Sequence, residues 1–399
     1  MRKIPMMLAI VVCFTLFPAG ARAAEGDEID RAIEDEITRN IESALGTADL
    51  YEIETYFNEH AQTLRPITGG MDLKSFVTKL AKGGADFDVS DVYQLVLDSM
   101  FQGVKKSIPA VIQIIIIALL FSIITHFKPA YKDSGVSKAA QTAQYVIIGT
   151  ITIGILVTAF KIGADAIIGM TSFTSEFFPI IISLLTALGG ITSAAILSPA
   201  TVFLTTGISL FFNSFIMPLI IVLTVFTLIN NFSTSIKLSG FCALIKSIIK
   251  WAIGISFTIF LGIIAIQGLI GSTFDGVSIK AAKYTIDKLV PIIGGMFSNT
   301  VDVLISCTLL IKNAVGIAGI IIIAAIVITP VFGILAHYFI FKLSAAVLEP
   351  VAGKEIGKFA SESADVLLLL FVAVLAAAAM FFITIAVIIG AGNTNIMLR

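Results

Sequence analysis

Charged side chains are scarce in this chain, and over one long stretch they are absent. Of the 399 residues, 13% are charged and 57% are hydrophobic, and the mean hydropathy is +1.00. Soluble domains carry about 25% charge. Between Glu176 and Lys237, sixty consecutive residues carry no charge. At about 1.5 Å per residue, such a run crosses a hydrocarbon core about 30 Å thick up to three times. The sequence therefore excludes a water-soluble domain and predicts an all-α, polytopic membrane protein.

Other absences narrow the function. Only three cysteines are present, which excludes a disulfide framework and indicates no metal site. The net charge is -1 and no basic cluster occurs, so the chain carries no sign of nucleic-acid binding. Neither a GxxxxGK[ST] loop nor an HExxH motif is present. We therefore expect a protein that is not an enzyme and that needs no cofactor.

The first residues have the pattern of a secretory leader. Arg2 and Lys3 precede an apolar stretch over residues 4–17, and small side chains follow at Ala21 and Ala23. This spacing predicts a signal peptide, residues 1–23, that is cleaved after Ala23. The alternative is an uncleaved first anchor helix. In both cases the residues that follow are delivered to the outside of the membrane.

Residues 24–107 differ from the rest, with seventeen acidic and eight basic side chains. Apolar residues recur at helical spacing, so we expect a small helical extracytoplasmic segment. Thr47, Asp72 and Ser90 are placed to cap helices, and Pro66 is expected to end one. One interpretation is a helical cap packed on the membrane domain. The other is a docking surface for extracytoplasmic partners.

Residues 108–399 form the predicted membrane domain. Five spans are clear, at 109–125, 145–160, 251–270, 315–335 and 367–389. The sixty-residue run adds one to three, so about seven spans are expected, with six to eight possible. Pro179, Gly189-Gly190, Pro199 and Pro218 interrupt that run, which predicts broken or re-entrant helices there.

Lysines suggest an orientation for these spans. The stretches 128–138, 237–250 and 342–358 each carry three lysines, and we expect all three on the cytoplasmic side. The stretch 271–288 also carries three lysines. The side of the C-terminus therefore stays open.

The chain partly matches itself when shifted by 112 residues, so that about 177–270 falls on about 289–390. Matched helix breaks are typical of transporters, whose sites lie where the broken helices meet. Chance is the alternative, because such matches are common in apolar sequence. If the repeat is real, its proline and glycine positions should meet near mid-membrane. These positions are Pro179, Pro218, Pro291, Pro330, Gly189, Gly190, Gly294 and Gly295.

Asp302 is the one acid between Leu289 and Leu310. An ionisable group at membrane depth is costly and usually faces a cavity or a partner. Asp302 is therefore the candidate polar site of the membrane domain. The alternative is a segment that lies in the membrane interface, where Asp302 is wet.

Several strings in the second half resemble those of one known family. They include Pro291-Ile292-Ile293-Gly294-Gly295-Met296-Phe297-Ser298, Leu309-Leu310-Ile311-Lys312-Asn313-Ala314-Val315-Gly316 and Tyr338-Phe339-Ile340-Phe341-Lys342-Leu343. Together with Ala187-Leu188-Gly189-Gly190-Ile191-Thr192-Ser193-Ala194, they closely resemble the stage III sporulation protein AE family. The resemblance extends from about residue 70 to the end.

The resemblance implies a multi-pass protein of the mother-cell membrane around the forespore of endospore-forming Firmicutes. It implies a channel complex with other membrane proteins of the same operon, a cytoplasmic secretion-type ATPase and extracytoplasmic ring-forming proteins. That complex sustains forespore gene expression and development. The family has no established catalytic residues to carry over. We therefore expect a channel or transporter-like subunit, with a structural scaffold or an autonomous secondary transporter as alternatives.

Overall fold

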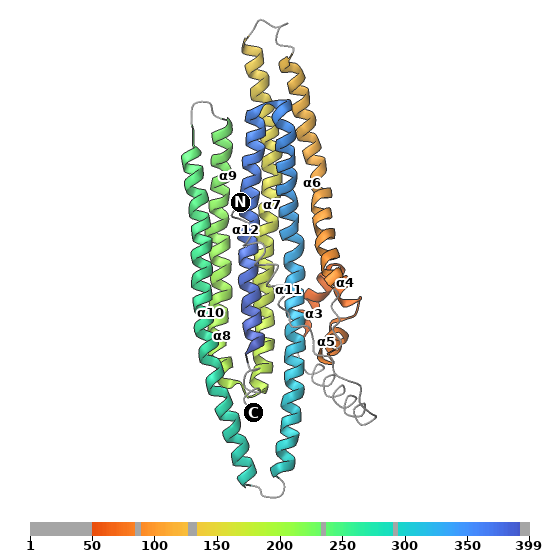
Figure 1. Cartoon of the computed structure of the whole chain (residues 1–399), viewed down its shortest axis with the longest axis vertical. Coiled ribbons are helices and arrows are strands. Elements are labelled where there is room, and N and C mark those ends of the chain that lie inside the picture. Colours follow the sequence, from red (N-terminus) through yellow and green to blue (C-terminus); the bar gives the residue numbers. More distant parts are fainter. Residues whose placement is uncertain (1–49, 84–88, 127–133, 233–236, 290–293, 392–399) are drawn as a thin grey trace.

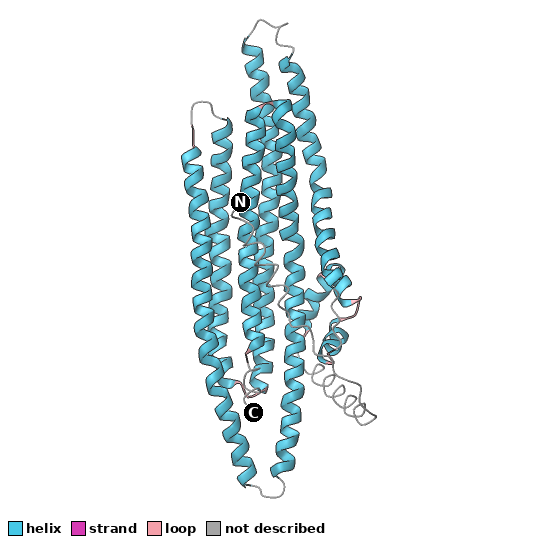
Figure 2. Cartoon of the chain, viewed as in Figure 1, coloured by secondary structure: helices cyan, strands magenta, loops and turns pink. Residues whose placement is uncertain are grey.

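The computed structural model describes residues 50–83, 89–126, 134–232, 237–289 and 294–391. Within these ranges the regular secondary structure is helical, without strands (Figure 2). The all-α class is therefore confirmed. The predicted signal peptide, including Ala21 and Ala23, and the predicted cap residue Thr47 lie outside the described residues.

Three short helices come first: α3 (Tyr51–Glu59), α4 (Ala61–Thr68) and α5 (Leu73–Ala81). The predicted cap of α5 is confirmed, because the Asp72 carboxylate accepts a hydrogen bond from the Ser75 amide at 3.4 Å. The prediction that Pro66 ends a helix is wrong. Pro66 lies inside α4, which ends at Gly69 with a φ of 63°. In so short a helix the proline removes a single hydrogen bond, whereas left-handed Gly69 closes the last turn.

Long helices make up the rest of the chain and alternate in direction (Figure 1). They are α6 (Val89–His126), α7 (Ser134–Ala187), α8 (Ile191–Phe211), the π-helical η2 (Phe212–Ile216), α9 (Met217–Phe232), α10 (Ser239–Leu289), α11 (Gly294–Ala352) and α12 (Lys354–Gly390). The segments α8, η2 and α9 form one continuous rod.

Five stretches of these helices are long and apolar enough to cross a bilayer. They are Thr142–Ala187, Ile191–Asn231, Ser239–Gln267, Ser306–Pro350 and Lys354–Gly390. Helix α6 carries a shorter apolar stretch, Val111–Leu120. A polytopic helical architecture follows, whereas the count of about seven spans stays a prediction. The counts differ partly because span 145–160 and the start of the uncharged run belong to one helix, α7.

The predicted proline breaks are wrong at four positions. Helix α7 continues through Pro179, α8 through Pro199 and α11 through Pro330. Pro218 lies in the first turn of α9, directly after the wide π-helical turn η2, and the rod does not break there. Each proline removes one backbone hydrogen bond, and the remaining bonds and the packed neighbours hold a long helix together. Pro291 lies outside the described residues.

The paired glycines behave differently. Helix α7 ends at Ala187 and α8 begins at Ile191, so Gly189-Gly190 separates them. Gly189 has a φ of 84°, a conformation that side chains other than glycine rarely adopt. Gly294 and Gly295 form the start of α11.

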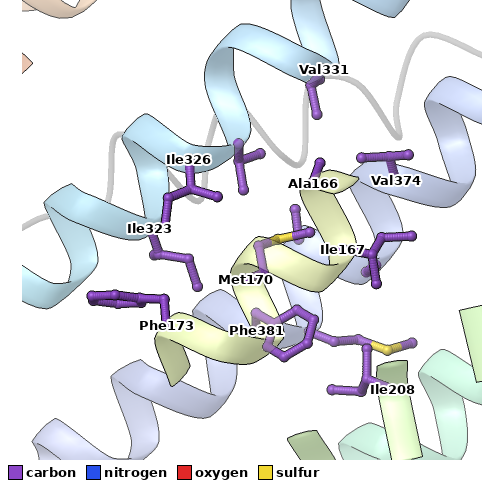
Figure 3. Packing of buried hydrophobic residues seen from close by; sticks show 14 of the residues in the cluster. Ala166, Ile167, Met170, Phe173, Ile208, Ile323, Ile326, Val331, Val374 and Phe381 are labelled. Carbon is purple, nitrogen blue, oxygen red and sulfur yellow. The ribbon is translucent and has the colours of Figure 1, made fainter. Parts of the chain in front are cut away.

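Helix α12 lies in the middle of the bundle (Figure 1). No residue from Phe359 to Ile385 is exposed, as expected for a helix that is apolar all round. Figure 3 shows its Val374 and Phe381 packed with Met170 of α7 and Ile326 of α11. In the described part of the chain, side chains therefore fill the axis of the bundle.

The connections of the bundle fall at two ends. Helices α9 and α11 end where α10 and α12 begin, so the lysine-bearing stretches 237–250 and 342–358 lie at the same end (Figure 1). Helix α7 also begins there. We call this the lysine end. The stretch 271–288 belongs to the second half of α10, toward the opposite end. That the lysine end is cytoplasmic stays a prediction.

Candidate functional site

Near the lysine end, an acidic side chain of α12 joins two lysines of neighbouring helices. The Asp365 carboxylate lies 2.9 Å from Lys342 Nζ on α11 and 3.7 Å from Lys246 Nζ on α10. Lys342 Nζ also donates to Ser361 Oγ at 2.8 Å. The Asp365 side chain is 42% exposed, so the cluster is partly open to its surroundings.

A second acid extends this network by one turn of α12. The Glu362 carboxylate accepts a hydrogen bond from Asn231 Nδ2 of α9 at 2.6 Å and lies 3.7 Å from Lys358 Nζ. Glu362 and Asp365 therefore both contact neighbouring helices. They tie α9, α10 and α11 to the central helix, although partly exposed ion pairs each contribute little stability.

Lys312 of α11 is the polar counterpart toward the other end. Lys312 is fully buried, with 0% of its surface exposed. Its Nζ donates to the carbonyl of Ile389 at 2.8 Å and to that of Ala391. These carbonyls belong to the C-terminal turn of α12, which has no partners within its own helix. Lys312 therefore caps α12. In the sequence, Lys312 is a lone lysine in an apolar run, and that isolation alone indicates a residue with a specific partner.

These two sets of charges bound a layer of uncharged helix. On α11 it comprises residues 313–336, between Lys312 and His337, which precedes Lys342 by five residues. At about 1.5 Å per residue its 24 residues extend roughly 36 Å, close to the thickness of a hydrocarbon core. The neighbouring uncharged stretches are 251–274 on α10 and 366–390 on α12. We call these three stretches the apolar layer.

The predicted polar site, Asp302, lies on α11 ten residues before Lys312, beyond the apolar layer. Its side chain lies outside the described residues, so its role stays a prediction. A common centre for the four prolines and the two glycine pairs also stays a prediction, because Pro291 is not described.

Reactive groups are few in the described part of the chain. There, no group of three or more His, Cys, Asp or Glu side chains is placed to hold a metal ion. Cys242 and Cys307 are free and buried, and Cys242 Sγ lies 4.0 Å from Thr227 Oγ1. The Asp365 network and Lys312 thus hold helices together at the two borders of the apolar layer, where charged groups can contact water.

Comparison with known proteins gives the biological setting. The family model for stage III sporulation protein AE matches residues 71–392. The chain is 28% identical over 326 residues to stage III sporulation protein AE of Bacillus subtilis (strain 168), covering 82% of each chain. No solved structure matches the chain.

Proposed function

The chain belongs to the stage III sporulation protein AE family, and we propose that it is a membrane subunit of the assembly that links the mother cell to the forespore. The observation that carries this proposal is the family match over residues 71–392, which includes all five candidate spans. The proposed partners are other membrane proteins of the same operon, a cytoplasmic secretion-type ATPase and extracytoplasmic ring-forming proteins.

The packing of α12 favours a solute path between several subunits over a path inside this chain alone. Leu367, Leu370, Val374 and Phe381 are fully buried along the axis of the bundle. A solute path through the chain therefore has no room along this axis. We propose that the chain is one wall of a channel enclosed by several subunits. This also argues against an autonomous secondary transporter, whose site would lie inside its own bundle.

The lysine end gives the proposal an orientation. We place this end in the mother-cell cytoplasm, facing the ATPase. The bundle alternates in direction, so the C-terminal end of α12 then lies toward the extracytoplasmic side, and α6 runs from the depth of α3–α5 toward the lysine end. This agrees with an exported N-terminal segment.

A structural scaffold is the second candidate. The observation that favours it is the Asp365 network, which ties three helices to α12 and gives a rigid body. A scaffold needs no polar surface at membrane depth, whereas the wall of a channel does.

The proposal is tested by deleting the gene in its own spore-forming host and following a reporter that is transcribed only in the forespore. We expect reporter activity to fail after engulfment and to return with the intact gene. Affinity purification of the tagged chain from sporulating cells should recover proteins of the same operon. Normal reporter activity and spore yield in the deletion strain would refute the proposed function. Transport by the purified chain alone in liposomes would instead support an autonomous carrier.

A further inference from the structure

The short helices α3–α5 lie beside the apolar layer, and aromatic contacts fix their depth. The Tyr56 ring of α3 meets the Phe173 ring of α7 edge-on, with centroids 5.4 Å apart. Phe173 stacks on Phe177 at 5.3 Å. The Phe177 ring lies against Gly319 of α11, where even a methyl group would overlap it. Gly319 belongs to the apolar layer, so α3 is at the depth of that layer.

The outer surface of α3–α5 is nevertheless charged. Helix α3 packs on α7, α4 on α6 and α5 on α11, and their apolar side chains join the main core. The charged side chains point away from the bundle and are exposed. They are Glu52, Glu59, Arg65, Asp72, Lys74, Lys79 and Lys82. Lipid chains offer such groups no hydrogen bonds, so this surface is unsuited to lipid.

Helix α7 continues the same polar face. Polar residues recur there at intervals that place them on one side of a helix. They are Thr158, Lys161, Asp165, Ser172 and Glu176. Lys161 and Asp165 are exposed. Their neighbour Gly163 faces Leu370 and Val374 of α12, inside the apolar layer.

Tyr56 links this stripe to α3. Burial, together with the nearby Glu176 carboxylate, raises the pKa of Tyr56 to about 12. Its hydroxyl interacts with Glu176 and with Ser172, both on the stripe of α7. The exposed side of α7, where Val157 and Ile168 are exposed beside the charged residues, therefore forms one continuous surface with the exposed side of α3–α5, and we call it the polar face.

The opposite side of the bundle is different. Helices α10 and α12 both run away from the lysine end, and the ion pair of Lys246 with Asp365 fixes their register (Figure 1). Counting equally along both helices places Ile255 and Ile266 beside about residues 374 and 385 of α12. Thr258 is exposed, and its hydroxyl donates to the Gly254 carbonyl, whereas the large exposed side chains of α10 at this depth are apolar. They are Trp251, Ile255, Ile259, Leu261 and Ile266. We call this surface the apolar face.

We propose that the polar face borders a water-filled space at membrane depth, enclosed between this chain and its neighbours in the assembly, while the apolar face meets lipid. The inference rests on the proposed function, because neighbouring subunits must supply the other walls. Residues 50–83 carry four acidic and four basic side chains. A lining of balanced charge suits polar solutes of either sign and does not select by charge.

The test is the reactivity of single cysteines in the full chain, expressed in sporulating cells and assayed in isolated membranes. Cys13, Cys242 and Cys307 are replaced by alanine. Asp165→Cys and Ile168→Cys probe the polar face, and Ile259→Cys probes the apolar face. We expect a positively charged, membrane-impermeant methanethiosulfonate to modify the first two at least ten times faster than the third.

A second pair of cysteine variants is chosen so that the substitutions do not disturb folding. Ser175→Cys on α7 and Thr258→Cys on α10 change little in size, and both parent residues are exposed. Low reactivity on both faces would overturn the proposal, because a partner protein or lipid then covers the polar face. Rapid reaction on both faces would also overturn it, because the apolar layer then lies outside the bilayer. The labelling needs no sporulation phenotype. A normal reporter in the deletion strain, with the expected labelling, would refute the proposed function and leave the polar face in place.

Discussion

The two outward faces of this bundle differ at the same depth. On α7 the exposed positions include Lys161 and Asp165 beside Val157 and Ile168, whereas on α10 the large exposed side chains, such as Ile255 and Ile259, are apolar. Both faces flank the same central helix, α12, so the difference does not come from the core. It indicates that the two sides of the molecule meet different surroundings.

The difference matters because a charged side chain in lipid and an apolar patch in water are both unfavourable. A lysine or aspartate at the centre of a spanning helix costs about 2.5–3.5 kcal/mol on the insertion scale. Conversely, an exposed apolar patch in water promotes association. A chain with both faces in lipid, or both in water, would bear one of these penalties along the length of a helix.

The largest expected effect comes from placing a new charge on each face. Ile259→Asp puts a carboxylate on the apolar face, at an expected cost of about 3 kcal/mol. Ile168→Asp puts the same group between Asp165 and Ser172 on the polar face, where water is expected. We predict that Ile259→Asp strongly lowers the amount of chain in the membrane fraction, whereas Ile168→Asp accumulates like the parent. Equal losses in the two variants would show that the faces do not differ.

A smaller effect is expected from filling the glycine contact beneath the polar face. Gly319→Leu must displace the Phe177 ring, and overpacking of this kind costs about 1–3 kcal/mol. The matched variant is Gly254→Leu on α10, where no atom lies within 4 Å of the place that an added methyl group would take. Thermal unfolding in detergent should show a lower Tm for Gly319→Leu alone. An unchanged Tm in Gly319→Leu would show that Phe177 does not pack on Gly319, and the depth of α3 would then not be fixed by this contact.

Removing the hydroxyl of Tyr56 should loosen the polar face without unfolding the bundle. Tyr56→Phe keeps the ring against Phe173 but loses the interactions with Glu176 and Ser172, at about 0.5–1.5 kcal/mol. Amide hydrogen exchange should then accelerate in α3 and stay unchanged in α12. Tyr51→Phe serves as the control, because Tyr51 is 75% exposed. Identical exchange in α3 of both variants would mean that the hydroxyl does not hold α3.

The smallest effect is confined to high pH. The pKa of Tyr56 is raised to about 12 in the folded chain, from an ordinary value of 10.0. Between these values the unfolded chain has lost the proton and the folded chain keeps it. The contribution of Tyr56 is therefore complete below about pH 10 and is lost as the pH rises through about 12. The absorbance at 295 nm should rise less between about pH 11 and pH 13 in Tyr56→Phe than in the parent chain. An equal rise in the two chains would show that Tyr56 does not ionise in this range.

The sequence alone predicts much of the architecture. The uncharged runs predict an all-helical membrane domain, and Asp72 marks the start of α5. The sequence pattern wrongly predicts helix breaks at Pro179 and Pro330, because the tertiary packing that supports a proline-containing helix is not visible in the sequence. Long helices with packed neighbours tolerate the loss of one hydrogen bond.

The polar face shows what sequence reasoning missed. Lys161, Asp165 and Glu176 suggest a loop between two spans, because they follow an uncharged stretch. Their three- and four-residue intervals indicate a helix stripe instead, but only the contacts from Tyr56 to Gly319 place that stripe at membrane depth. Depth is a long-range property and has no local signature. The capping role of Lys312 likewise depends on Ile389 and Ala391, far along the chain.

Collision of spin labels with two quenchers distinguishes water from lipid at each face. Nitroxides at positions 168 and 259 are compared in the full assembly in native membranes, with oxygen as the apolar quencher and a water-soluble nickel chelate as the polar one. If the polar face borders water and the apolar face borders lipid, the label at position 168 collides mainly with nickel and the label at position 259 mainly with oxygen. Preference for oxygen at both positions would contradict this expectation, because the polar face would then lie in lipid.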